Sequence, residues 1–215
     1  EILRKENIPL FTLETKTPVM DFDIVGFSLS SELNYTNVLN LLDISKITIF
    51  SKERGNNEPI IIAGGNSVFN PFPLIPFIEV FVIGEGEEAM GKIVETYREL
   101  RGEKRETILK CLSEIQGVFV PMFPKNNIKK ATIFDFENSY FPKKYLVPLT
   151  DIIHDRISLE IMRGCYRNCK FCQAGKCWKP VRKRSPEKVL EIAKETFEKT
   201  GYEEISLLSF SAGDH

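Results

Sequence analysis

The chain has 215 residues, of which 42% are apolar, 11% aromatic and 27% charged, a globular composition too apolar for intrinsic disorder. Lys and Arg number 29 against 30 Asp and Glu, so no net charge attracts nucleic acid or anionic lipid. No apolar run approaches the ~18 residues of a membrane helix, and the charged opening ILRKENIPLF excludes a signal peptide. Because Glu1 rather than Met comes first, we expect further residues upstream.

Strands and helices are predicted to alternate over the first 120 or so residues. The expected strands are 22–30, 47–50, 59–65 and 79–88, and the expected helices follow the apolar periodicity at 35–42, 90–100 and 103–116. This alternation predicts an α/β fold with a flavodoxin-like or Rossmann-like parallel sheet. Residues 124–150 have the prolines and mixed charges of a linker.

Small residues follow three of these strands. In open parallel sheets, ligands bind at the carboxyl ends of the strands, so we interpret these positions as a ligand crevice. The alternative is that the glycines only make tight turns. The candidate crevice residues are Ser28, Gly64, Gly65, Gly84, Glu85 and Gly86.

A second unit is predicted after the linker, with a strand at 157–162, a cysteine loop, a helix and a strand at 205–210. Ser185 is the expected helix cap, Pro186 occupies the first helical position and Gly201 ends the helix. This is one strand–loop–helix–strand unit, far short of a closed barrel.

Four of the five cysteines lie within 13 positions, which indicates metal chemistry in a reducing, cytoplasmic compartment. Cys165, Cys169 and Cys172 are spaced C-x3-C-x2-C directly after a strand. Three thiolates on such a loop can hold three irons of a cubane iron–sulfur cluster and leave the fourth open. Cys177 could add a fourth ligand, or C-x2-C-x4-C could hold zinc, so an electron carrier and a zinc-binding interaction module remain rival functions.

Cations dominate the surroundings of this loop, because residues 161–186 contain no Asp or Glu. Positive charge would stabilise an anionic cluster and the thiolate forms of the cysteines, although a charge run is also typical of a solvated face. The basic run lends weak support to an RNA substrate. The cations are Arg163, Arg167, Lys170, Lys176, Lys179, Arg182, Lys183 and Arg184.

The segment RGCYRNCKFCQAG, with its three-cysteine spacing and an aromatic residue before the last cysteine, resembles the radical S-adenosylmethionine superfamily. The resemblance implies a 4Fe-4S cluster on Cys165, Cys169 and Cys172, S-adenosylmethionine on the open iron, and Phe171 near the adenine. It also implies reductive cleavage to a 5′-deoxyadenosyl radical. The segment expected to receive the methionyl amino group has Ser-Ala-Gly-Asp in place of the familiar Gly-Gly-Glu, and its candidate residues are Ser209, Ser211, Gly213 and Asp214.

The upstream strands are similar to the cobalamin-binding-like domains that precede many radical enzymes. The Asp-x-His-x-x-Gly signature is absent and the histidines are His154 and His215, so any cobalamin would bind without a histidine ligand. We therefore predict a cobalamin-binding-like domain at 1–145, lacking its first strand, and the first βαβ of a radical S-adenosylmethionine barrel at 146–215.

The resemblance also implies partners. We expect an electron donor such as flavodoxin or ferredoxin, no membrane, and a substrate that the sequence does not identify. One βαβ cannot enclose a radical, so we expect this fragment to be inactive alone, and its open sheet edges predict self-association.

Overall fold

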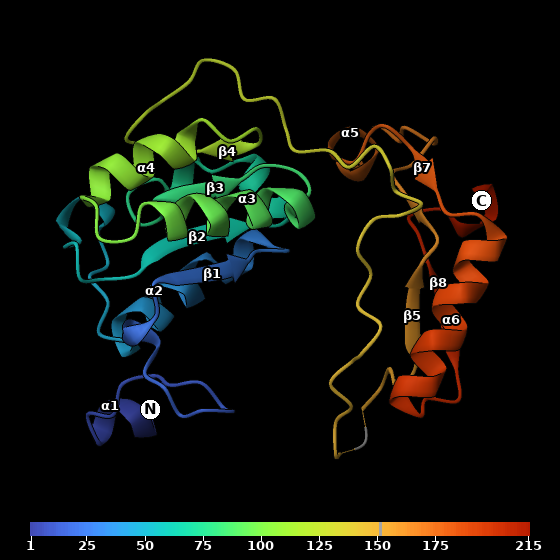
Figure 1. The fold of residues 1–215 in the computed structure, drawn as a ribbon, viewed down its shortest axis with the longest axis horizontal. Coiled ribbons are helices and arrows are strands. Elements are labelled where there is room, and N and C mark those ends of the chain that lie inside the picture. The colour runs from blue at the N-terminus through green and yellow to red at the C-terminus, as the bar shows by residue number, and fades with distance from the viewer. Residues whose placement is uncertain (151) are drawn as a thin grey trace. The chain divides into compact units, whose positions relative to one another are not determined.

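The computed structural model describes residues 1–150 and 152–215 (Figure 1). The chain divides into two compact units, Glu1–Thr132 and Ile133–His215, which we call unit 1 and unit 2. The domain boundary expected between residues 145 and 146 falls within unit 2. Whether the two functions divide at that position stays a prediction. Inside the described ranges, no helix combines the length and the apolar character needed to cross a membrane.

Unit 1 is built on a single sheet with the order β1-β2-β3-β4. Its strands are β1 (Ile24–Ser28), β2 (Ile60–Gly64), β3 (Val80–Val82) and β4 (Val118–Phe119). β1, β2 and β3 are parallel, with Ile24 opposite Ile60 and Ile62 opposite Val80, whereas β4 is antiparallel to β3. The predicted α/β fold with a parallel sheet is thus confirmed, with one antiparallel strand at its edge.

Helices cover both faces of this sheet, as the near-continuous apolar character of β2 requires (Figure 1). Ile60 and Ile62 pack with residues of α3 and α4 on one face, while Ile61 and Ala63 pack with residues of α2 on the other. The α-helices of unit 1 are α1 (Ile2–Lys5), α2 (Tyr35–Ile44), α3 (Gly86–Glu99) and α4 (Arg105–Ser113). Its 3-10 helices are Val19–Asp21, Glu32–Asn34, Ser51–Glu53, Asn66–Phe69 and Phe72–Leu74.

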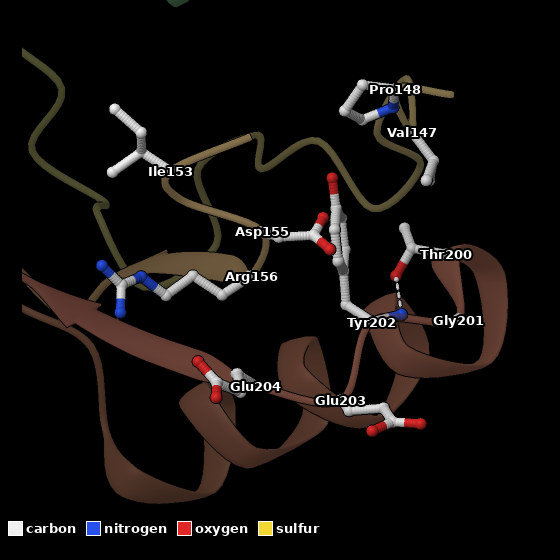
Figure 2. Close-up of a pocket in the computed structure, with 10 residues that line it drawn as sticks. All are labelled: Val147, Pro148, Ile153, Asp155, Arg156, Thr200, Gly201, Tyr202, Glu203 and Glu204. Atoms are coloured by element: carbon white, nitrogen blue, oxygen red, sulfur yellow. Dashed lines mark hydrogen bonds between the residues drawn. The ribbon is translucent and has the colours of Figure 1, made fainter. Parts of the chain in front are cut away.

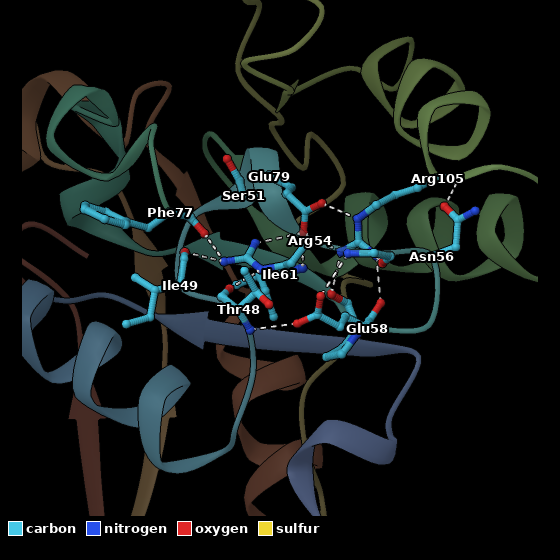
Figure 3. Close-up of polar contacts among 12 residues, drawn as sticks. Thr48, Ile49, Ser51, Arg54, Asn56, Glu58, Ile61, Phe77, Glu79 and Arg105 are labelled. Atoms are coloured by element: carbon cyan, nitrogen blue, oxygen red, sulfur yellow. Dashed lines mark hydrogen bonds and ion pairs between the residues drawn. The ribbon is translucent and has the colours of Figure 1, made fainter.

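The strand predicted at 47–50 is wrong, because side chains occupy the backbone groups that a neighbouring strand would use (Figure 3). The Thr48 N–H donates to Glu58 Oε1 at 2.7 Å. The Arg54 guanidinium donates to the Thr48 carbonyl at 2.8 Å and to the Ile49 carbonyl at 2.7 Å. These bonds satisfy the segment without a partner strand.

A buried ion cluster anchors the same region (Figure 3). Arg54 and Glu79 are only 7% and 5% exposed, and Arg54 Nη1 lies 3.0 Å from Glu79 Oε2. Arg105, the first residue of α4, approaches Glu79 Oε1 with its Nε at 2.6 Å. Glu79 immediately precedes β3, so the cluster fixes the start of that strand against the start of α4.

Unit 2 contains the parallel pair β5 (Ile157–Glu160) and β8 (Ile205–Leu208), with Ile157 opposite Ile205. A second, antiparallel pair consists of β6 (Met162–Arg163) and β7 (Arg182–Lys183). The helices are α5 (Ala174–Cys177), α6 (Pro186–Thr200) and the 3-10 helix Ala212–Asp214. The core joins Ile157 and Leu159 of β5 to Ile192 and Ala193 of α6, which confirms the predicted βαβ unit.

Both ends of α6 are as predicted. The Ser185 hydroxyl accepts the Lys188 N–H at 3.1 Å, Pro186 begins the helix, and Gly201 ends it with a left-handed φ of 72°. These are local signals, since a cap needs only an acceptor at the N-terminus and a residue tolerant of positive φ at the C-terminus.

Part of the predicted linker is instead integrated into unit 2. The side chain of Arg184 is 2% exposed, and its guanidinium lies 4.3 Å from the centre of the Phe136 ring. Arg184 also donates to the Glu137 carbonyl and to Ser139 Oγ, both at 2.9 Å. Glu137 accepts the Ser185 N–H at 2.8 Å. A free linker would not supply these buried partners, so residues 133–141 belong to the fold of unit 2.

Candidate functional site

The cysteine loop leaves the sheet at β6 and returns to it at β7, so both of its ends are fixed by one antiparallel pair. Gly164 opens the loop with φ 93°, and a Cβ there would lie 2.7 Å from the Trp178 carbonyl oxygen. Only glycine allows this close approach of the outgoing and returning backbone. Trp178 itself packs against Phe210, with ring centroids 6.4 Å apart.

The three cysteines of the loop are accessible and outside any disulfide. Cys165 and Cys172 are half-buried and Cys169 is exposed. The Cys172 N–H donates to the Cys169 carbonyl at 3.1 Å, which forms a turn between these two ligand candidates. The Arg167 N–H donates to Cys165 Sγ at 3.4 Å.

This donor set fits a cubane cluster in kind. Within residues 1–150 and 152–215, no three Cys, His, Asp or Glu side chains lie close enough together to hold a single metal ion. Zinc needs all its ligands to converge on one ion. A cubane takes one thiolate at each of three irons, which is the number of ligands that Cys165, Cys169 and Cys172 can supply.

Three of the cations around the loop have partners within unit 2. Arg163 pairs with Glu160, its Nη2 lying 2.6 Å from Oε2, and it stacks on the Phe136 ring at 5.0 Å. Arg184 is buried against Phe136 and bonds to the backbone. Arg182 donates to the Ile133 and Pro180 carbonyls. These three side chains therefore stabilise unit 2 itself.

Arg167 is the cation that bridges the cysteine loop to the predicted cofactor segment. It forms two hydrogen bonds with the Asp214 carboxylate. The pKa of Asp214 is lowered by the Ser211 hydroxyl and then by Arg167, so the carboxylate is charged at neutral pH. The same contact raises the pKa of Arg167. The pairing was missed from the sequence, because the two residues lie 47 positions apart and no local pattern links them.

The other residues predicted to bind S-adenosylmethionine lie in different elements and differ in their surroundings. Ser209 and Ser211 belong to the same turn after β8, where the Ser211 N–H donates to Ser209 Oγ at 3.2 Å. Gly213 lies in the 3-10 helix Ala212–Asp214, with no atom within 4 Å of an added Cβ. Phe171 is 93% exposed, which leaves its face available to a ligand. Their roles toward S-adenosylmethionine stay predictions.

In unit 1, the candidate crevice residues lie at the carboxyl ends of β1, β2 and β3, where the sequence predicted them. Two of the glycines, however, make room for the chain's own backbone. A Cβ on Gly65 would lie 2.5 Å from the Leu29 carbonyl oxygen, and one on Gly84 would lie 2.2 Å from that of Ala131. Glu85 is buried and Gly86 starts α3.

Ala131 forms an isolated bridge with Gly84, which places this backbone beside the predicted crevice. Unit 1 contains no histidine, since His154 and His215 both belong to unit 2. These observations do not fit a histidine-ligated cobalamin. Cobalamin binding without a histidine stays a prediction.

A cavity of about 540 Å³ in unit 2 lies at the opposite ends of the strands (Figure 2). Asp155 and Arg156 precede β5, and Glu203 and Glu204 precede β8, so the cavity adjoins the amino ends of both strands. The cysteine loop and Asp214 follow the carboxyl ends, where parallel α/β proteins place their chemistry. His154 is exposed, between Ile153 and Asp155 of the cavity lining, and its Nδ1 lies 2.9 Å from Arg156 Nη2.

Two family models match the chain, one within each unit. The family model described as "Radical SAM proteins, N-terminal" matches residues 1–121, and the model described as "Radical SAM superfamily" matches residues 159–209. The second match includes the cysteine loop, α6 and β8. No solved structure matches the chain.

Three relatives are informative. An uncharacterised protein of Methanocaldococcus jannaschii is 27% identical over 99% of this chain and 44% of its own length. A candidate methylthiotransferase of the same organism is 28% identical over 94% of this chain and 41% of its length. The anaerobic magnesium-protoporphyrin IX monomethyl ester cyclase of Cereibacter sphaeroides is 27% identical over 54% of this chain and 19% of its length.

The chain therefore spans less than half the length of these curated relatives. The N-terminal model covers more than half of the chain, and the second model covers the loop that carries the three cysteines. On this evidence the chain belongs to the radical SAM superfamily.

Proposed function

We propose that this chain carries the cluster-binding part of a radical SAM enzyme. Cys165, Cys169 and Cys172 hold three irons of a 4Fe-4S cluster, and the fourth iron is left for S-adenosylmethionine. The observation that carries the proposal is the C-x3-C-x2-C loop directly after β6, inside the segment matched by the superfamily model. When bound, such a cluster supplies the electron that cleaves S-adenosylmethionine into methionine and a 5′-deoxyadenosyl radical.

The chain's own residues contribute binding and orientation. The antiparallel pair of β6 and β7 fixes both ends of the loop, and Gly164 lets the two ends approach. The bond between Arg167 and Asp214 ties the loop to the segment Ser209–Asp214, which is expected to receive the methionyl amino group. The exposed ring of Phe171 offers a stacking surface for an adenine.

Reductive cleavage of S-adenosylmethionine requires an electron donor. A low-potential donor such as flavodoxin or ferredoxin would deliver the electron. An RNA substrate, to which the basic run lends weak support, stays a prediction; two cations of that run, Arg182 and Arg184, donate to backbone carbonyls of unit 2. We assign no substrate.

Anaerobic reconstitution with iron and sulfide tests the ligand assignment. The wild-type chain should bind about four irons and four sulfides and gain the broad visible absorbance of a cubane. Replacing Cys165, Cys169 and Cys172 together by alanine should abolish both. Cys111→Ser, in α4 of unit 1, is the matched control and should leave them unchanged. Survival of the iron and the colour in the triple variant would refute the assignment.

Cys177 separates this proposal from the rival functions. It is the last residue of α5, outside the three-cysteine spacing. Cys177→Ser should keep the cluster in this chain, and the S-adenosylmethionine cleavage in the full-length enzyme, if three cysteines suffice. Loss of the cluster in this variant would favour a four-cysteine electron carrier. Zinc without acid-labile sulfide in anaerobically purified protein would favour a zinc-binding module.

A further inference from the structure

An ion pair joins two distant segments of unit 2, in addition to the packing of Trp178 against Phe210. Arg167 lies between Cys165 and Cys169, and Asp214 ends the 3-10 helix after β8. Arg167 Nε lies 2.9 Å from Asp214 Oδ2, and its Nη2 lies 2.7 Å from Oδ1. Two parallel hydrogen bonds fix the plane of a guanidinium relative to a carboxylate, which a single contact does not.

Asp214 is the fixed member of this pair. The Ser211 hydroxyl donates to its Oδ2 at 2.8 Å, and Lys183 of β7 donates to its backbone carbonyl at 2.5 Å. Its side chain is 20% exposed, against 64% for Arg167. Ser211 thus holds the carboxylate of Asp214 and Lys183 holds its backbone, so the contact restrains the more exposed Arg167 and the loop that carries it.

The backbone of Arg167 connects this restraint to the cysteines. Its N–H donates to Cys165 Sγ at 3.4 Å. The side chain of Arg167 is therefore anchored beside the end of β8 while its own amide contacts the first cysteine. A movement of Cys165 therefore disturbs a residue whose side chain is bonded to Asp214.

We propose that Arg167 is a positioning residue, which through Asp214 holds the cysteine loop beside the segment Ser209–Asp214 so that both form one site. This rests on the proposed function, because it assigns the loop to cluster binding and the segment to cofactor binding. The pair orders the loop before any cluster is present. It therefore makes a prediction about the chain without iron.

Hydrogen exchange of the chain without cluster tests the restraint directly, in peptides covering 164–173 and 209–215. Arg167→Gln and Asp214→Asn should each exchange about fivefold faster in the loop, as expected when a well-formed surface ion pair is lost. Arg167→Lys keeps the charge but not the two parallel bonds, so it should rescue part of the protection. Lys188→Gln, which removes an exposed ion pair with Glu191 on α6, is the matched control and should leave the loop unchanged. Wild-type protection in Arg167→Gln would overturn the proposal.

Reconstitution with iron and sulfide then tests the consequence for the site. Arg167→Gln should slow the growth of the cluster absorbance several-fold, and Arg167→Lys should recover part of the rate. If Arg167→Gln loosens the loop but assembles the cluster at the wild-type rate, the positioning role is refuted. If the wild-type chain binds no cluster, the proposed function fails, while the exchange data still decide whether Arg167 and Asp214 restrain the loop.

Discussion

Gly84→Ala probes the close approach that joins β3 to the segment at Ala131. Gly84 has φ 107°, and an added Cβ would lie 2.2 Å from the Ala131 carbonyl oxygen. A contact this short forces one backbone away from the other. The displaced bonds would be Ala131 N–H to the Ile83 carbonyl at 2.9 Å and Glu85 N–H to the Ala131 carbonyl at 3.1 Å.

The expected loss of stability follows from these contacts. Left-handed backbone costs alanine about 1–2 kcal/mol, and each weakened hydrogen bond costs about 1 kcal/mol. The total for Gly84→Ala is about 3–4 kcal/mol. Gly102 has φ 95° but no atom within 4 Å of an added Cβ, so Gly102→Ala should lose only the backbone part, about 1–2 kcal/mol. Gly26 in β1 has neither feature, and Gly26→Ala should change stability by about 0.5 kcal/mol or less.

Exchange of the slowest amides in β2 and β3 is the suitable assay, because it reports the unfolding of unit 1. The single tryptophan, Trp178, belongs to unit 2 and would not report it. Both variants introduce the same kind of backbone strain. The difference between their losses in unfolding free energy therefore measures the effect of the close approach of Ala131 to Gly84. Equal losses in these two variants would refute the reasoning.

Three further changes test the polar anchors of the two units. Glu79→Gln leaves the buried Arg54 without its counter-charge and should destabilise unit 1 by about 3–5 kcal/mol in the same exchange assay; a loss below about 1 kcal/mol would contradict the buried cluster. Arg184→Met keeps a similar volume but removes the bonds to residues 137 and 139, so it should destabilise unit 2 by about 2–4 kcal/mol. The unfolding of unit 2 is measured by tryptophan fluorescence, and wild-type stability would mean that this arginine is not an anchor. The Ser185 hydroxyl and amide lower the pKa of Glu137 below its ordinary 4.5, so its contribution is present above that pH and is lost as the pH falls through the lowered value. Glu137→Gln should therefore make the stability of unit 2 less sensitive to acid. If the free energy of unfolding of the variant and of the wild type falls equally between pH 6 and pH 3, this prediction is wrong.

Patterns of residues close together in the sequence were enough to predict much of the fold and the family of this protein. The alternation of apolar runs with helical periodicity was enough to predict the α/β fold, since each element buries its own apolar face. Ser185 and Gly201 marked the ends of α6, because capping depends on groups a few residues apart. The cysteine spacing was sufficient to indicate the superfamily, since three ligands on one short loop need no distant residue.

Tertiary structure decided what depends on residues far apart in the chain. Residues 47–50 have the composition of a strand, but Arg54 and Glu58 take their backbone groups. The charge run looked like one cationic face, yet Arg184 is buried against Phe136 while Arg167 pairs with Asp214. The sequence alone does not distinguish a charged residue or a glycine that contacts water from one that contacts a ligand or the chain's own backbone. Its partner is fixed only when the fold brings distant segments into contact.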